Sequence, residues 1–181
     1  MKKLPNKEEK LLYIEPPLPL ALAVLPVLAF APSAVSIELH GGLFQDFAPS
    51  FYHIEHVLLP LLNRMGMAAD VRLERPGYVP MGQGIWRLSA IPAKNPLQPL
   101  ILDQAGVVKK ISGIALSSRL KERSVSDRMA ETAKQALSAA GYHADIQVLY
   151  DDNALQAGAC LAVFADLSGG ARIGSDRAGA P

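Results

Sequence analysis

Few residues of this chain could carry out acid–base or metal chemistry. His53 and His56 stand one helical turn apart, so on a helix they share a face and could both bind zinc. A zinc site needs a third ligand, however, and the HExxH spacing is absent. A solvated helix face is therefore the favoured interpretation. Asp151 and Asp152 follow a predicted strand and could hold a cation, although a solvated turn is again favoured.

The stretch GYVPMGQG (77–84) has the glycine content of a loop that cradles phosphate. No lysine follows it, and no Ser or Thr stands where a nucleotide loop places one. The sequence contains no GxxxxGK[ST], GxGxxG or GxSxG motif. His40 and His143 stand alone at predicted strand or turn positions, with no nucleophile near them in sequence. Composition leaves two functions open for 77–84, which are phosphate binding and reversal of the chain.

Basic residues gather around the start of one predicted helix. The candidates for contact with RNA phosphates are Lys109, Lys110, Arg119, Lys121 and Arg123. Acidic neighbours dilute this patch, so an ordinary charged face is the favoured interpretation. The formal net charge of the chain is +1, which gives no general electrostatic case for binding nucleic acid.

Composition limits the class of protein. Half of the 181 residues are hydrophobic, as in a folded domain. Cys160 is the only cysteine, which excludes an intramolecular disulfide and a cysteine-based zinc site. It lies in an apolar run and is predicted to be a buried, unreactive thiol.

The apolar stretch 18–31 follows a charged segment and so imitates a secretory signal. Acidic residues precede it, Pro19 and Pro26 interrupt it, and it is shorter than the roughly 20 residues that span a bilayer. A buried helix of a cytoplasmic protein is the favoured interpretation, and an exported protein is the alternative.

Hydrophobic periodicity predicts an α/β protein. Helices are expected at 18–31, 50–66 and 121–141, with Ser50 as N-cap, a kink at Pro60 and Gly66 as the stop of the second helix. Strands are expected at 34–42, 69–75, 84–91, 107–116, 144–150, 160–167 and 171–176. The proline-rich stretch 92–99 reads as a linker. We therefore expect a charged, poorly ordered segment at 1–15 and two units at 16–96 and 97–181.

Several segments together resemble RNA 3'-terminal phosphate cyclases. These are HGG followed by APSFYHIEHVLLPLLNRMG, then ERPGYVPMGQGIWRL, SGIALSSRLKERSVSDRMAETA and GARIGSDRAGA. They occur in the family's order and spacing, from about Leu18 to the end of the chain. The resemblance implies an α/β (α+β) fold. Residues 16–96 would be one βαβαββ repeat of an EPSP-synthase-like domain, and 97–181 most of a small α/β insert domain.

The resemblance also implies a function. Members of the family use ATP, with magnesium, to convert an RNA 3'-phosphate into a 2',3'-cyclic phosphate through a histidine–AMP intermediate. This is a ligase-class reaction of RNA processing in the cytoplasm. In the family, the equivalent of 77–84 is a glycine-rich connection between neighbouring strands, and Gln83 replaces one of its glycines. The resemblance thus favours a turn for this stretch.

The chain departs from the family at the positions that would face a nucleotide. Leu22 replaces a glutamine, Leu43 and Phe44 replace a Thr-Asp pair, and Ser50 replaces a proline that lies against adenine. Only Ala48, Pro49 and Ser50 are carried over, as a remnant of the nucleotide pocket.

No histidine here matches the family's nucleophile, and no catalytic residue or metal ligand is assigned. We therefore expect a truncated member, inactive alone and doubtful in binding ATP. A non-catalytic RNA-binding module of ribosome maturation is an alternative. A single repeat should also leave parts of 18–31 and of the 51–65 face exposed, which favours self-association.

Overall fold

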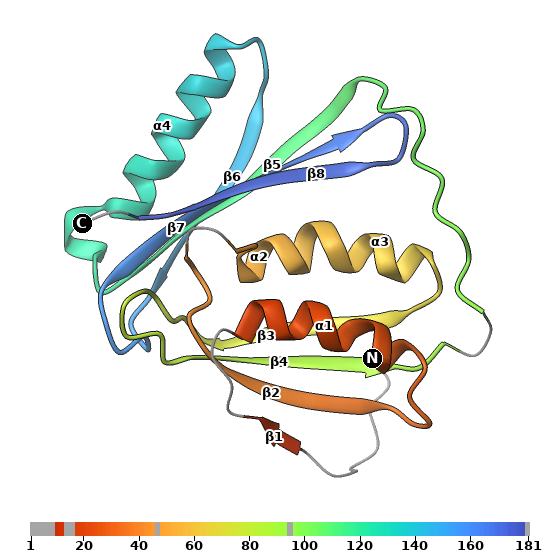
Figure 1. Ribbon diagram of the computed structural model, residues 1–181. Coiled ribbons are helices and arrows are strands. Elements are labelled where there is room, and N and C mark those ends of the chain that lie inside the picture. Colours follow the sequence, from red (N-terminus) through yellow and green to blue (C-terminus); the bar gives the residue numbers. More distant parts are fainter. Residues whose placement is uncertain (1–9, 13–16, 46–47, 94–95, 180–181) are drawn as a thin grey trace.

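The computed structural model describes residues 10–12, 17–45, 48–93 and 96–179 and contains two four-stranded sheets with helices between and outside them (Figure 1). The mixed α/β class predicted from the sequence is confirmed. Most of the N-terminal segment 1–15 lies outside the described residues, but the short strand β1 belongs to it.

The first sheet is built from the N-terminal half of the chain. Its elements follow the order β1 (Lys10–Leu12), α1 (Pro17–Ala29), β2 (Val35–Gly41), α2 (Phe51–His53), η1 (Ile54–Leu58), α3 (Leu59–Arg64), β3 (Ala68–Arg75) and β4 (Gly84–Ile91). The strands are ordered β1-β2-β4-β3, with β1 parallel to β2 and the other pairs antiparallel. This is the βαβαββ order that the family resemblance implies.

The helix α1, which contains most of the apolar stretch 18–31, packs on the first sheet. Leu18, Ala21, Leu25 and Leu28 recur at helical spacing and are buried against β2 and β4. The predicted helix is present, and it is buried on the side that faces the sheet, whereas Val27 and Phe30 are exposed. Within the described part of the chain, no helix is both long enough and apolar enough to cross a membrane.

The helical segments α2, η1 and α3 run without interruption from Phe51 to Arg64. As predicted, Ser50 caps the start, its Oγ accepting a hydrogen bond from the N–H of His53 at 3.2 Å. The predicted disturbance at Pro60 takes the form of a π-helical turn just before it. Pro60 has no N–H to donate to the carbonyl of His56, four residues earlier. Arg172, from the C-terminal half of the chain, donates to that carbonyl instead, at 3.0 Å.

The second sheet is built from the C-terminal half. Its elements are β5 (Val108–Ser118), η2 (Lys121–Arg123), α4 (Val125–Ala139), β6 (Ala144–Asp151), β7 (Gly158–Leu167) and β8 (Arg172–Ala178). The strand order is β6-β5-β7-β8, with β5 parallel to β6 and the other pairs antiparallel. The helix α4 lies over this sheet, on the side away from the first sheet (Figure 1).

The second sheet covers the helical run of α2, η1 and α3 from the side opposite the first sheet (Figure 1). Phe51, Ile54 and Val57 are consequently buried, in one apolar core with Phe164 of β7. The expectation that the 51–65 face is uncovered is wrong for these residues, because a neighbouring sheet from the same chain supplies the missing cover.

The glycine-rich stretch 77–84 joins β3 to β4 and reverses the chain, as the family resemblance implies. The backbone at the start of this loop lies so close to the backbone at its end that a Cβ on Gly77 would lie 2.2 Å from the amide nitrogen of Gly84. The side chain of Tyr78 extends from this loop to β5 of the second sheet, where its hydroxyl is 2.9 Å from Oγ of Ser118. Gln156 donates hydrogen bonds from its side chain to the carbonyls of Tyr78 and Val79. The loop therefore joins the two units.

Gln83 has a φ of +55°, a left-handed conformation that favours glycine. We expect Gln83→Gly to raise the free energy of unfolding by about 1 kcal/mol, or the melting temperature by about 2–4 °C. Arg75 donates to the backbone carbonyl of Gln83, and this bond survives the substitution. Gln83→Ala keeps the strained conformation and serves as the control in thermal melts. Equal melting temperatures for the two variants would contradict the strain at this position.

Candidate functional site

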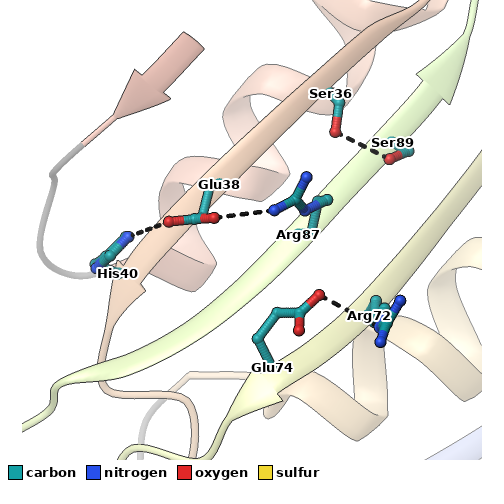
Figure 2. Close-up of polar contacts among 7 residues, drawn as sticks. All are labelled: Ser36, Glu38, His40, Arg72, Glu74, Arg87 and Ser89. Atoms are coloured by element: carbon teal, nitrogen blue, oxygen red, sulfur yellow. Dashed lines mark hydrogen bonds and ion pairs between the residues drawn. The ribbon is translucent and has the colours of Figure 1, made fainter. Parts of the chain in front are cut away.

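His40 belongs to a row of polar side chains on the face of the first sheet that is turned away from the helices (Figure 2). Its Nε2 lies 2.8 Å from a carboxylate oxygen of Glu38, whose other oxygen accepts from Nη2 of Arg87 at 3.1 Å. Ser36 and Ser89 share a hydrogen bond of 3.2 Å next to them. His40 is thus bonded to Glu38 of its own strand, and Glu38 in turn forms an ion pair with Arg87 on the neighbouring strand β4.

The other three histidines do not come together at a site. His56 packs beside Phe164, with ring centroids 4.8 Å apart, and its Nε2 lies 3.3 Å from Glu55. His53 ends α2, and His143 is exposed after α4. The residues that the structure describes include no group of three or more His, Cys, Asp or Glu side chains placed to hold a metal ion.

Asp151 and Asp152, the adjacent acids considered above as a cation site, stand at the end of β6 and in the turn that follows it. One oxygen of Asp151 accepts hydrogen bonds from the backbone N–H groups of Asn153 and Ala154, at 2.9 and 3.0 Å. Arg119 braces the same turn, because its Nε donates to the carbonyl of Ala154 at 2.7 Å. The carboxylate of Asp151 therefore orders its own loop.

The predicted nucleotide remnant, Ala48, Pro49 and Ser50, lies between the two sheets at the start of α2. Ser50 is buried, and its N–H donates to the carboxylate of Asp176 on β8 at 2.8 Å. The N–H of Ser50, which could contact a phosphate, therefore already has a partner within the chain, and its Oγ accepts the helix-capping bond from His53. Asp176 also sets a negative charge beside this segment, which disfavours a bound phosphate there.

Leu43 and Phe44, which replace the family's polar pair, are 0% and 1% exposed. The ring of Phe44 packs against Tyr52 and Tyr78, with centroid distances of 5.5 and 5.4 Å. Burial raises the pKa of both tyrosine hydroxyls, so they stay protonated at physiological pH. Leu22 packs half-buried against the same core. Apolar and aromatic side chains therefore fill the positions at which the family would present polar groups.

The predicted RNA-contact residues do not form one patch. Lys109 and Lys110 lie at the start of β5, whereas Arg119, Lys121 and Arg123 follow its end. Residues 111–118 of β5 lie between the two groups and separate Lys110 from Arg119 by roughly 30 Å. A single short RNA segment would have to run along the strand to contact both groups.

The surroundings of the two groups also differ. Near the first group, Lys109 and Lys110, the carboxylate of Asp166 forms an ion pair with Arg172 at 2.5 Å. The hydrogen bond from Arg172 is the main cause that lowers the pKa of Asp166, and the charge of Lys110 contributes. In the second, Lys121 and Arg123 are exposed, next to the start of α4. Lys109 and Lys110 are exposed as well, so the second group differs from the first in lying next to a helix start and not in its accessibility.

Sequence reasoning missed Tyr78, Asp176 and Arg172, which connect the two units. Tyr78 carried a usable signal, since a lone aromatic residue in a glycine-rich turn has no neighbours of its own to pack against. The partners of Asp176 and Arg172 are more than 100 positions away, at separations of 126 and 116 residues. No local pattern indicates such contacts.

Comparison with known proteins agrees with this fold and these motifs. A family model described as RNA 3'-terminal phosphate cyclase matches residues 19–172. The chain is similar to the RNA 3'-terminal phosphate cyclase of Methylococcus capsulatus, with 36% identity over 68% of this chain and 34% of the relative. It is also similar to the cyclase of Pyrobaculum aerophilum, with 32% identity over 85% of this chain and 44% of the relative.

This chain thus spans less than half the length of each of these relatives. The family match extends through both sheets, from α1 to the start of β8. The chain therefore belongs to the RNA 3'-terminal phosphate cyclase family.

Proposed function

We propose that this chain takes part in RNA processing in the cytoplasm, as a component of the family's cyclase reaction. That reaction converts an RNA 3'-phosphate into a 2',3'-cyclic phosphate with ATP and magnesium. Membership of the family supports this proposal. In this scheme residues 16–96, together with the strand β1 that pairs with them, are one core repeat, and 97–181 are most of the insert domain.

The described residues do not fit ATP at the positions that the family resemblance assigns to it. Leu43 and Phe44 are part of the core, and the N–H of Ser50 is bonded to Asp176. Covalent adenylation also needs a nucleophile held by its surroundings. His53 lies beside this segment, but its bond to Ser50 is made by the backbone N–H and does not orient the imidazole ring. The burial of Leu43 and Phe44 is the observation that carries our conclusion that this chain does not form the adenylate by itself. Its role as scaffold and RNA contact rests on membership of the family.

The exposed pair Lys121 and Arg123 is the best-placed contact for RNA phosphates. These side chains extend from η2 at the start of α4, where helix N–H groups add positive potential. Lys109 and Lys110 provide a matched comparison at the opposite end of β5, with the same number of charges.

Adenylation and RNA binding test the two halves of this proposal. We expect no covalent label when the purified chain is incubated with α-labelled ATP and magnesium, and no cyclisation of an RNA 3'-phosphate. The cyclase of Pyrobaculum aerophilum is the positive control. We expect the chain to bind a 3'-phosphorylated oligonucleotide, and Lys121→Glu with Arg123→Glu to weaken that binding at least several-fold more than the same change at Lys109 and Lys110.

Two results would contradict the proposal. One is an acid-labile adenylate that a single histidine substitution removes. The other is RNA binding that both charge reversals reduce equally, or that is absent. Binding should also weaken as salt rises, because phosphate contacts release counterions.

We also propose that copies of the chain associate with one another. The support is the apolar surface that α1 leaves exposed, which the described part of the chain does not cover.

A further inference from the structure

A polar pocket of about 330 Å³ lies between the C-terminal half of α4 and the start of β6. This volume is within the range of small-molecule sites, which is about 300–1,000 Å³. The helix α4 is on the side of the second sheet that faces away from the first sheet (Figure 1), so the pocket is separate from the positions that the family resemblance assigns to the nucleotide. Its polar lining consists of Glu131, Lys134, Gln135, Ser138, Tyr142 and His143.

The helix α4 and the turn after it place these side chains together. The four lining residues from α4 stand at positions i, i+3, i+4 and i+7 and therefore share one side of the helix. Gly141 has a φ of +83°, and its N–H donates to the carbonyl of Ser138 at 2.9 Å. The N–H of Tyr142 donates to the carbonyl of Leu137, also at 2.9 Å. This pair of bonds is a Schellman motif, which fixes the course of the chain through Tyr142 and His143 beside the helix.

Two basic side chains of the pocket have no partner within the chain. In the ranges that the structure describes, neither the ammonium group of Lys134 nor the ring of His143 has a hydrogen-bond or ion-pair partner. Glu131 is the only carboxylate among the described lining residues, and it accepts a hydrogen bond from Gln135 at 2.8 Å. Lys134 is half-buried, so it loses part of its hydration without a counter-ion to replace it. An anion in the pocket would supply that counter-ion.

Neighbouring negative groups are turned away from the pocket or already bonded. Asp145 stands on β6 between Ala144 and Ile146, whose side chains pack in the core under α4, so its carboxylate points to the opposite face of the sheet. The last carbonyls of α4 carry the negative end of the helix dipole. N–H groups of the following turn bond to three of these carbonyls, which offsets their charge.

We propose that this pocket binds a nucleoside monophosphate, either free or as the end of an RNA chain. The phosphate contacts Lys134 and His143, both of which can donate charge-assisted hydrogen bonds to it. The base stacks on the ring of Tyr142, which is 44% exposed, because an aromatic side chain stacks with any base. The amide of Gln135 and the hydroxyl of Ser138 belong to the same lining and can bond to the ribose hydroxyls. The inference goes beyond the proposed function and does not rest on it.

Binding of AMP to the full chain tests this site. The pocket offers two basic groups and one exposed ring, so we expect a dissociation constant on the order of 0.1 mM in isothermal titration calorimetry. Adenosine lacks the phosphate and inorganic phosphate lacks the base, so each should bind at least about fivefold more weakly than AMP. Lys134→Gln and Tyr142→Ala should each weaken the binding of AMP at least about fivefold, for the same two reasons.

Two further variants are controls. Tyr142→Phe keeps the ring and should bind AMP nearly as well as the unmodified chain. Arg72→Gln removes one exposed positive charge from the first sheet, away from the pocket, and should leave AMP binding unchanged. The substituted side chains are exposed or half-buried, so the far-ultraviolet spectrum of each variant should match that of the unmodified chain.

Competition with a 3'-phosphorylated oligonucleotide distinguishes the two sources of the ligand. An oligonucleotide that displaces AMP identifies an RNA end, whereas one that does not displace it identifies a free nucleotide. No measurable binding of AMP at millimolar concentration would overturn the proposal, as would binding that Lys134→Gln and Arg72→Gln weaken equally. Inorganic phosphate that binds as tightly as AMP would also overturn it, because the base would then contribute nothing. None of these results depends on adenylation, so they are independent of the cyclase test.

Discussion

Replacing Tyr78 by alanine is expected to lower the free energy of unfolding by about 3–5 kcal/mol, the cost of truncating a large buried aromatic residue. Tyr78 is 3% exposed and packs against Phe44. Its ring also fills the space above Gly158, where a Cβ would lie 2.2 Å from the ring. Because these contacts join the loop of the first unit to strands of the second, the loss should also loosen the association of the two sheets. Chemical denaturation measures the first effect and hydrogen exchange along β5 and β7 the second.

Tyr78→Phe separates packing from hydrogen bonding. It keeps the ring but leaves the buried hydroxyl of Ser118 without the partner that Tyr78 provides. We expect a loss of about 1–3 kcal/mol, most of which the added change Ser118→Ala should restore. A Tyr78→Ala variant that is no less stable than Tyr78→Phe would show that the ring does not join the units.

Gly77→Ala is expected to destabilise the fold by about 3 kcal/mol, because the atoms around the new methyl group cannot move aside. The added Cβ would lie 2.2 Å from the nitrogen of Gly84 and 2.5 Å from the carbonyl oxygen of Gly82. Both are backbone atoms of the same tight loop, so relief requires β3 and β4 to separate at this end.

Gly141→Ala is the matched control for this prediction. Gly141 has a φ of +83° but no atom within 4 Å of an added Cβ. Its replacement should cost only about 1–2 kcal/mol, the price of the left-handed conformation. Thermal and urea melts of both variants measure the difference. Equal losses would mean that the close approach at Gly77 is relieved without separating the strands.

The local elements of this protein could be predicted from its sequence, because each depends on neighbours within a few residues. Alternation located β2 and β4, and helical spacing located α1 and the run from Phe51 to Arg64. The cap at Ser50 and the left-handed stop at Gly66 were equally local. The three-residue strand β1 was missed, since it is too short for a pattern and exists through its pairing with β2. The motifs also identified the family, because they depend on residue identity and order.

Only the tertiary structure decided what the candidate residues do. It separated Lys109 and Lys110 from Arg119 and the residues after it, because β5 is fully extended between them. In the fold, Leu43 and Phe44 are part of the core. The backbone N–H of Ser50 donates a hydrogen bond to Asp176, a residue 126 positions away. Such contacts depend on how the two sheets pack around one helical run, and a local pattern carries no information about that packing. For the same reason the sequence showed that α1 is apolar all round, but only the fold showed which side is left open.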